Sequence, residues 1–432
     1  MLIFNREFRK LIYNISRLKL KLNLEIIRVF CIFAFLISRL NKMIDRFIEK
    51  ELTDLLKQFP AVTILGARQA GKTTLARKVL KKLGNKAVYY DLEKLSDRRK
   101  LNDIETTLGN YQNKCVIIDE AQTMPELFSA LRPLIDEKRK AGRFLLLGSV
   151  SPHLVKGVSE TLAGRIAHIE LSTINLKEAL KSKITQNQLW LRGGYPEALQ
   201  LKTNANWYKW IENYYRNFIE RDVNFLMGET LSPSTVNKLW TMLSGINGNI
   251  VVYDVIARSL GISRPTTLKY MDFLEGAYLV HRLQPWFNNI NKRLVKAPKI
   301  YFRDTGVLHY LNGVSSWEDL QNDICIGASW EGFVIEQIKQ LMPATLSAYF
   351  YRTHHGAEAD LVLVKGNKPI ACIEIKLNNA PHLTRGWHEV VTDLKTENNF
   401  VITPNSDTYW HDQKTMVCSL SNFIKIHLSL LK

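Results

Sequence analysis

The sequence predicts an α/β fold that begins with a parallel sheet carrying a phosphate-binding loop and ends in a separate α/β domain. Three observations predict it. The loop GARQAGKT stands between a short apolar run and a segment with helical spacing. Further short apolar runs alternate with helical segments, which is typical of a parallel sheet covered on both faces. From about residue 300, strands and helices alternate again after a mainly helical middle.

The first domain is predicted from short strands and amphipathic helices. The run AVTIL before the loop is apolar and partly β-branched, as in a buried strand, and the segment after the loop has apolar residues on one helical side and lysines on the other. Three similar apolar runs follow. The predicted strands are 61–65, 87–90, 114–118 and 143–148, within a domain of residues 43–175.

The middle of the chain is predicted as a helical lid over 176–245, followed by a winged-helix-like segment over 246–300. In that segment a helix ends near Leu260, Gly261 makes the turn, and Ser263 caps a second helix through Leu274. The remaining residues, 301–432, form the second α/β domain, with strands expected in YFRD, SAYFYRT, ADLVLV and ACIEIKL and a helix in WEGFVIEQIKQL.

Composition and charge narrow the function classes. With 432 residues and 46% apolar composition, the chain can bury several cores, which excludes disorder as its main state. The net charge of +18 predicts a polyanionic partner such as DNA, because a basic surface attracts phosphates. The five cysteines are scattered, without the paired spacing of a zinc site or a disulfide framework, and this favours a reducing cytoplasm.

Residues 1–42 are interpreted as an N-terminal extension, either an upstream-extended start or a peripheral helix. They carry nine Lys or Arg, two Glu and the apolar run 29–38. Ten residues fall short of the roughly 20 that cross a bilayer. A signal-peptide core is an alternative, although no small-residue cleavage pattern follows it. The sequence therefore argues against a membrane span, and a membrane-tethered protein would rest on this run alone.

The loop predicts a site for ATP and Mg²⁺. Residues 66–73 match G-x-x-x-x-G-K-[ST], in which the glycines let successive backbone N–H groups approach a phosphate. Lys72 would reach the β and γ phosphates, and Thr73 would ligate Mg²⁺. The predicted nucleotide-binding residues are Gly66, Ala67, Arg68, Gln69, Ala70, Gly71, Lys72, Thr73 and Thr74.

Four further residues are predicted to complete this site. Asp119, at the end of the apolar run CVII, is expected to hold Mg²⁺, and Glu120 beside it to polarise the attacking water. A solvated strand end is the alternative reading of this pair. Ser149 follows another strand and is a candidate sensor of the γ phosphate, with a turn or cap as the alternative. Arg165 is the candidate for stabilising transition-state charge, and an ordinary surface arginine is equally compatible.

Taken together, these motifs resemble prokaryotic AAA-type P-loop ATPases whose C-terminal domain has a restriction-endonuclease-like core. The resemblance runs from Met43 to near the end of the chain. It implies ATP binding and hydrolysis and a link to DNA, and it leaves assembly as a homo-oligomer open. Its marks are GARQAGKTT, VIIDEAQ, LLLGSVS, LAGRI, RGGYPEAL, the ERD of 220–222, YFRDTG, GAEADLVL and IEIK.

The same resemblance implies a second metal site in the C-terminal domain. Nucleases of this type hold a metal between an Asp and a Glu that stands two residues before a Lys. Asp360, Glu374 and Lys376 have that order, and alternation places the last two on one face of a strand. Glu331, on the preceding helix, matches a further acidic residue of such folds. A chance pattern in charged strands, or a vestigial domain, is the alternative.

A DNA contact is predicted on the second helix of the winged-helix-like segment. A basic stretch after it could line a wing, and such three-helix units also serve as protein contacts or lids. The leading hypothesis is an ATPase that couples nucleotide state to DNA binding or processing; the rival is a non-enzymatic ATP switch with an inactive terminus. The candidate DNA residues are Arg264, Thr266, Thr267 and Lys269, with Lys292, Arg293, Lys296 and Lys299 in the wing.

Overall fold

The computed structural model describes residues 43–151, 162–223, 232–287 and 295–431. Residues from Arg46 onward form one compact unit. The apolar run 29–38 lies outside the described residues. Among the helices that are described, none combines the length and apolar character needed to cross a membrane.

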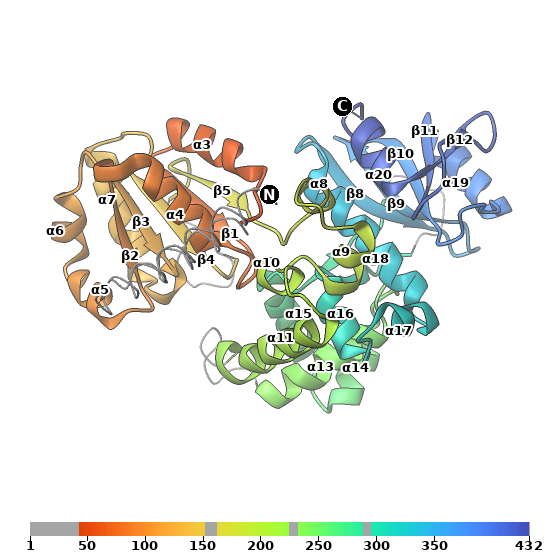
Figure 1. Ribbon diagram of the computed structural model, residues 1–432, viewed down its shortest axis with the longest axis horizontal. Helices are drawn as coiled ribbons and strands as arrows, with labels where there is room; N and C mark the ends of the chain where they lie inside the picture. The colour runs from red at the N-terminus through yellow and green to blue at the C-terminus, as the bar shows by residue number, and fades with distance from the viewer. Residues whose placement is uncertain (1–42, 152–161, 224–231, 288–294, 432) are drawn as a thin grey trace, which may run out of the picture. The chain divides into compact units, whose positions relative to one another are not determined.

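The first sheet has five parallel strands in the order β2-β3-β4-β1-β5 (Figure 1). It confirms the four strands predicted from apolar runs and adds a fifth at one edge. All residues of β1, β3 and β4 are buried, because helices cover both faces of the sheet. The strands are β1 Ala61–Leu65, β2 Ala87–Asp91, β3 Cys115–Asp119, β4 Phe144–Gly148 and β5 Ile166–Glu170.

Neighbouring residues of one strand enter different cores. Ile117 packs with Leu75 and Val79 of α4, whereas the next residue, Ile118, packs with Leu131 of α7. The sheet therefore lies between two helical layers. The helical elements of this part are α3 Ile48–Gln58, α4 Lys72–Leu83, η1 Gly84–Lys86, α5 Leu95–Lys100, α6 Ile104–Gly109, η2 Ala121–Thr123 and α7 Glu126–Glu137.

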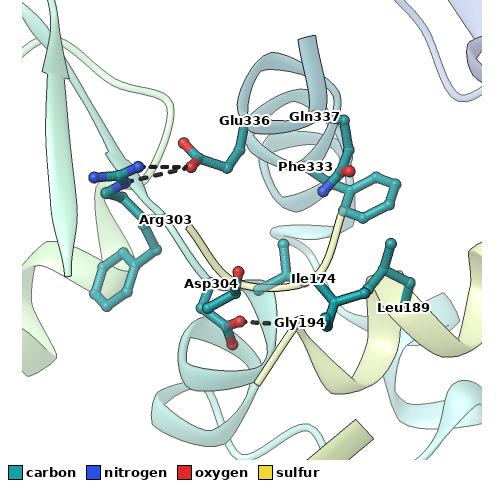
Figure 2. A pocket seen from close by; sticks show the side chains of 11 residues that line it. Ile174, Leu189, Gly194, Arg303, Asp304, Phe333, Glu336 and Gln337 are labelled. Carbon is teal, nitrogen blue, oxygen red and sulfur yellow. Dashed lines mark hydrogen bonds and ion pairs between the residues drawn. The ribbon is translucent and has the colours of Figure 1, made fainter. Parts of the chain in front are cut away.

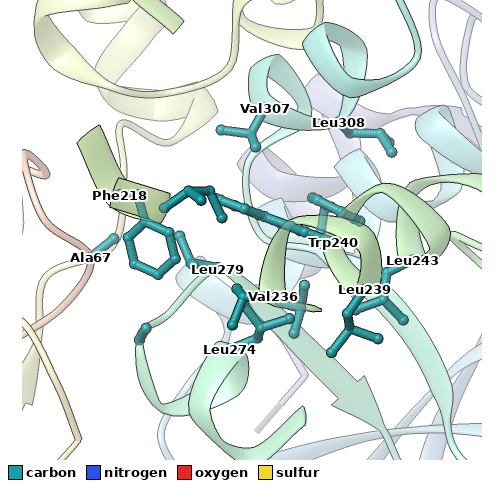
Figure 3. Close-up of a cluster of buried hydrophobic side chains, with 14 of the residues drawn as sticks. Ala67, Phe218, Val236, Leu239, Trp240, Leu243, Leu274, Leu279, Val307 and Leu308 are labelled. Atoms are coloured by element: carbon teal, nitrogen blue, oxygen red, sulfur yellow. The ribbon is translucent and has the colours of Figure 1, made fainter. Parts of the chain in front are cut away.

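A mainly helical part follows, built around an aromatic cluster. In Figure 3 the ring of Phe218 and the indole of Trp240 lie among aliphatic side chains of α13, α15 and α16, and these two rings are 5.1 Å apart. Ala67, from the phosphate-binding loop, belongs to the same cluster. The elements are α8 Leu176–Lys181, α9 Gln186–Arg192, α10 Pro196–Leu199, α11 Asn204–Asn217, η4 Phe218–Asp222, α13 Pro233–Gly245, α14 Tyr253–Leu260, α15 Arg264–Gly276, α16 Thr305–Leu311 and α17 Trp317–Asn322.

The helix-turn-helix has the predicted boundaries. Gly261 ends α14 in the left-handed conformation, and the Ser263 side chain caps α15 by accepting a hydrogen bond from the Thr266 backbone. Two antiparallel strands follow, β6 Val280–Leu283 and β7 Lys299–Phe302. The predicted domain boundary at residue 300 falls inside β7, which pairs with β6 and not with the C-terminal sheet.

The C-terminal part is a six-stranded mixed sheet in the order β12-β13-β11-β10-β9-β8. Strands β8, β9 and β10 are an antiparallel meander, and α19 connects β10 to its parallel neighbour β11. They confirm three of the four strands predicted after residue 300, and the fourth, in YFRD, overlaps the end of β7. The elements are α18 Ile326–Leu341, β8 Leu346–Arg352, β9 Glu358–Lys365, β10 Lys368–Ile375, α19 Arg385–Leu394, β11 Asn398–Thr403, β12 Tyr409–Trp410, β13 Thr415–Ser419, α20 Leu420–Asn422 and η6 Phe423–His427.

Candidate active site

The phosphate-binding loop joins β1 to α4, and its glycines are required by the backbone. Gly66 has φ +148°, and a Cβ built there would lie 2.2 Å from the Leu171 carbonyl oxygen. Gly71 has φ +101° immediately before α4, and Gln69 between them also has a positive φ. The loop can therefore turn tightly and expose its backbone N–H groups at the start of the helix.

Lys72 is buried at the N-terminus of α4 and reaches back over the loop. Its ammonium donates to the carbonyl oxygens of Gly66 at 2.8 Å and Ala67 at 2.9 Å. Burial lowers the pKa of Lys72 to about 8, against the opposing charges of Glu120 and Asp119. The lysine is thus held at the place where the helix N-terminus favours negative charge.

Thr73 and Asp119 meet directly, although 46 residues separate them. The Thr73 hydroxyl donates to Asp119 Oδ2 at 2.7 Å, and the Tyr89 hydroxyl donates to the same oxygen at 2.5 Å. Burial and Asp119 raise the pKa of Tyr89, so this tyrosine stays a donor. A hydroxyl and a carboxylate oxygen are ligands that suit Mg²⁺. Sequence reasoning missed Tyr89, whose only signal was its place on a neighbouring strand.

Glu120 and Ser149 form the other half of the site. The Ser149 hydroxyl donates to both carboxylate oxygens of Glu120, at 3.0 and 3.2 Å, and the Gln122 amide donates to Glu120 as well. Strand β4 lies between β1 and β3, and Leu65 pairs with Gly148 in register. This register places Ser149 between the loop and the acidic pair, as the sequence predicted.

The structure does not bring Arg165 into this group. Its guanidinium binds Asp136 through two hydrogen bonds of 2.7 and 2.8 Å, and its carbonyl accepts from the N–H of Ala61 at the start of β1. Strand β1 has five residues and a rise of about 3.3 Å per residue, so its start, where Arg165 lies, is roughly 13 Å from its end, where the phosphate-binding loop begins. Arg165 is therefore at the opposite end of the strands. Arg165, the candidate for stabilising transition-state charge, is not among the residues that the structure brings together at this site.

Arg46 is a residue of the loop's surroundings that sequence reasoning missed. It donates to the Ala70 carbonyl at 2.9 Å and forms an ion pair of 3.1 Å with Glu178, which also caps α8. Its guanidinium therefore ties the loop to the helical part. No motif surrounds Arg46 in the sequence. The remaining predicted loop residues lie at the surface: Gln69 and Thr74 are exposed, and Arg68 pairs with Glu93 at 2.6 Å.

The motifs RGGYPEAL and YFRDTG contact each other. In Figure 2 the carboxylate of Asp304 points toward Gly194, whose backbone N–H donates to it at 2.7 Å, and Arg303 points toward Glu336 of α18. A Cβ on Gly193 would lie 2.0 Å from Asp304, so only glycine fits there. Burial raises the pKa of Asp304 to about 6. Arg303 also pairs with Glu170 at the end of β5, so this contact connects three parts of the chain.

The C-terminal candidates also come together. Glu331 of α18, Asp360 of β9 and Glu374 of β10 interact, and burial together with the charges of Glu331 and Glu374 raises the pKa of Asp360 well above its usual range. Lys376 forms an ion pair of 2.6 Å with Glu374. These residues do not have the arrangement expected of a metal site. Among the described residues, no three His, Cys, Asp or Glu side chains are placed to hold a metal ion.

The candidate DNA residues are divided by burial. On α15, Lys269 is exposed, Arg264 is exposed and pairs with Asp254 at 3.3 Å, and Thr266 is half-buried against Ser263. Thr267 is completely buried and its hydroxyl donates to the Ser263 carbonyl, so its predicted DNA contact is wrong.

The predicted wing is only partly described. Lys292 and Arg293 lie outside the described residues, and Lys296 is exposed. Lys299 is 4% exposed and surrounded by carboxylates. The prediction that Lys299 lines a wing is therefore wrong.

Comparison with known proteins finds three matching families along the chain. Residues 58–180 match an AAA domain, 184–318 a domain of unknown function (DUF8612) and 326–423 another (DUF4143). The chain is similar to the uncharacterized protein Rv2008c of Mycobacterium tuberculosis, with 38% identity over 354 residues, 82% of this chain and 78% of that protein. It is also similar to the uncharacterized protein MJ1544 of Methanocaldococcus jannaschii, with 23% identity over 84% of this chain and 85% of that one. Among solved structures, the Walker-type ATPase PABY2304 of Pyrococcus abyssi aligns with a TM-score of 0.45 and 16% identity, over 62% of this chain and 96% of that chain.

Proposed function

Since this chain belongs to the same family as the mycobacterial protein and has an AAA-type P-loop ATPase domain, we propose that it is a Mg²⁺-dependent ATPase that couples its nucleotide state to DNA binding or processing. One observation carries the catalytic half of the proposal. Thr73 and Asp119 are in direct contact at 2.7 Å, beside the loop that holds Lys72. This is the arrangement that a triphosphate and its metal ion require.

Each residue of the site has a role in the proposed hydrolysis. The backbone N–H groups of the loop and the ammonium of Lys72 bind the β and γ phosphates, for which Lys72 leaves the carbonyls of Gly66 and Ala67. Thr73 and Asp119 would hold Mg²⁺, which would neutralise charge at the phosphates. Glu120 accepts a proton from the attacking water, and Ser149, bonded to Glu120, orients that carboxylate and contacts the γ phosphate.

The decisive experiment is ATP hydrolysis by the full chain, measured with and without duplex DNA. Glu120→Gln should keep nucleotide binding and reduce turnover by on the order of a hundredfold, because it removes the proton acceptor and leaves the loop intact. Glu126→Gln, at the start of α7 in the same domain, is the matched control and should hydrolyse ATP at the parent rate. Full turnover in Glu120→Gln would contradict the assigned role of Glu120, and absence of turnover in the parent would contradict the enzyme itself.

The DNA half of the proposal rests on charge and on α15. The chain carries a net charge of +18, and Arg264 and Lys269 expose cationic side chains on the second helix of a helix-turn-helix. Such a helix can reach phosphates and base edges in a groove. Stimulation of ATP turnover by duplex DNA would support the coupling; equal turnover with and without DNA would count against it.

A second candidate is a non-enzymatic ATP-dependent switch whose nuclease-like C-terminal domain is inactive. The inactive terminus is favoured because, within the described ranges, no three His, Cys, Asp or Glu side chains are grouped to hold a metal ion. ATP turnover separates the two candidates, because only the first hydrolyses ATP. Incubation of duplex DNA with the protein and Mg²⁺ or Mn²⁺ tests the inactive terminus, because a nuclease would release fragments that Asp360→Asn abolishes.

For the compartment we propose the cytoplasm, supported by the four described cysteines, which are all free thiols.

A further inference from the structure

Charged side chains gather around Lys299 in a group that we call the C-terminal acidic cluster, and Lys299 is its most deeply buried member. The other members are Glu331, Glu358, Asp360, Glu374 and Lys376. Lys299 belongs to β7, which precedes the six-stranded sheet in the chain and pairs with β6. Its ammonium lies 3.0 Å from Glu331 Oε1, 2.7 Å from Glu358 Oε1 and 3.8 Å from Asp360 Oδ1. The Tyr301 hydroxyl, two residues along the same face of β7, also donates to Glu331.

The carboxylates account for the charge of this lysine. The side chain of Lys299 is 4% exposed, and the carboxylates of Glu331 and Glu358 lie within hydrogen-bond distance of its ammonium. An unpaired ammonium so deeply buried would be very costly. The lysine and the acidic residues therefore compensate each other, and each would be destabilising without the other.

This arrangement is not that of a metal centre. A divalent ion needs several oxygen ligands at about 2.0 to 2.6 Å, and an ammonium cannot serve as a ligand because it has only donors. The distances from the Lys299 ammonium to Glu331 and Glu358 are those of hydrogen bonds, and Asp360 lies at ion-pair distance. The cluster's other lysine, Lys376, is already paired with Glu374. In the part of the chain that the structure describes, no group of three potential ligand side chains surrounds an ion position.

We propose that Lys299 is the resident cation of this cluster, and that the cluster takes no divalent ion while Lys299 is in place. A fold of the nuclease type implies a metal ion bound by Asp360 and Glu374; the residues present do not fit that ion. The cluster is instead an ion-pair junction that fastens β7 to α18 and β9. This inference goes beyond the proposed ATPase activity and does not depend on it.

A second set of ion pairs follows directly after β7. Arg303, the next residue after the strand, reaches Glu336, a second acidic residue of α18. Arg303 also pairs with Glu170 of β5 in the ATPase sheet. Lys299 and Arg303 therefore contact α18 at two positions, and the ion pairs of Arg303 extend to the nucleotide-binding domain.

Binding of Mn²⁺ without nucleotide tests the proposal, measured by electron paramagnetic resonance on the full chain. All proteins carry Asp119→Asn, so that the nucleotide site does not contribute a metal ligand. The protein that keeps Lys299 should show no bound Mn²⁺ that depends on Asp360. Lys299→Met should gain one bound Mn²⁺, with an affinity at least about tenfold higher than that of the protein that keeps Lys299. Adding Asp360→Asn to Lys299→Met should remove this ion. Lys299→Arg, which keeps a cation in place, should behave like the parent.

One result overturns the proposal: a bound Mn²⁺ in the Lys299-containing protein that Asp360→Asn removes. This comparison requires only proteins that retain the lysine, so it decides the question even if Lys299→Met does not fold. Where the methionine variant folds, its melting temperature should rise on adding Mn²⁺ while that of the parent stays constant, and equal responses would contradict the proposal. ATP turnover is measured separately with Asp119 intact, so a failed ATPase and a metal-binding cluster are distinguishable.

Discussion

Lys72, at the start of α4, and Asp119, at the end of β3, contribute opposite charges to the same site. Lys72 is held by carbonyl oxygens of the loop, and Asp119 by the hydroxyls of Thr73 and Tyr89. Neither charge is neutralised by a direct ion pair with the other among the contacts described. Both are therefore held by neutral dipoles, which can be exchanged for phosphate and metal at modest cost.

The first residue-scale prediction concerns Lys72. Lys72→Ala should reduce ATP turnover by on the order of a hundredfold or more, because it removes the only cation that the motif directs at the β and γ phosphates. Lys81→Ala, on the exposed side of the same helix, is the matched control and should stay within about twofold of the parent. Steady-state phosphate release measures both. Parent-level turnover in Lys72→Ala would remove the assigned role.

The second residue-scale prediction concerns the effect of pH on nucleotide affinity. The nucleotide-free protein has a Lys72 pKa of about 8, so the phosphate-binding form is lost as pH rises through 8. Bound phosphate restores the proton to the ammonium, and linkage then requires nucleotide affinity to fall as pH rises above about 8, by up to tenfold per pH unit. Titration of a fluorescent ATP analogue between pH 6.5 and 9.5 measures this. An affinity that is flat across this range would contradict the assigned ionisation of Lys72.

Individual elements owe their positions to close backbone contacts. The turn at Gly193 lies against Asp304, which begins α16, and Gly306 in the first turn of that helix leaves no room for a Cβ near the Arg192 carbonyl. Two glycine-containing segments more than 100 residues apart are thus fitted to each other. The buried Asp304 carboxylate joins them by accepting from Gly194 and Val307.

This contact predicts an unequal response of two glycines to the same change. Gly193→Ala should lower the free energy of unfolding by about 2 to 4 kcal/mol, because the new methyl group meets Asp304 as well as a positive φ. Gly313→Ala has a similar φ of +76° and no atom within 4 Å of the new Cβ, so it should cost only about 1 kcal/mol. Urea denaturation measures both. Equal losses would show that the Asp304 contact contributes nothing.

At the scale of the whole molecule, the positive charge should govern DNA affinity. Duplex affinity should fall steeply between about 50 and 200 mM salt, because bound phosphates release counterions. Arg264→Ala and Lys269→Ala together should reduce the slope of log affinity against log salt by about 2, if both side chains contact phosphates. Exposed Lys414→Ala, in the C-terminal sheet region, is the control. An affinity without salt dependence would contradict the DNA proposal.

The sequence by itself determined the local features of this protein. Four of the five strands of the first sheet, the loop at 66–73 and the turn of the helix-turn-helix were predicted correctly, because apolar periodicity, glycine and caps act within a few residues. It also predicted that Thr73, Asp119 and Ser149 would converge, since parallel strands present their carboxyl ends at one edge.

Only the tertiary structure decided the rest. Arg165 pairs with Asp136 at the end of the sheet opposite the loop. Thr267 is buried where α15 packs against the helical core, and Lys299 is buried among carboxylates, so neither side chain is exposed to DNA. Each outcome depends on which distant segments meet: β1 beside Arg165, the helical core beneath Thr267, and β9 with α18 around Lys299. A charged residue looks the same in the sequence whether it faces solvent or an opposite charge, and burial, which follows from the packing of distant segments, makes the difference.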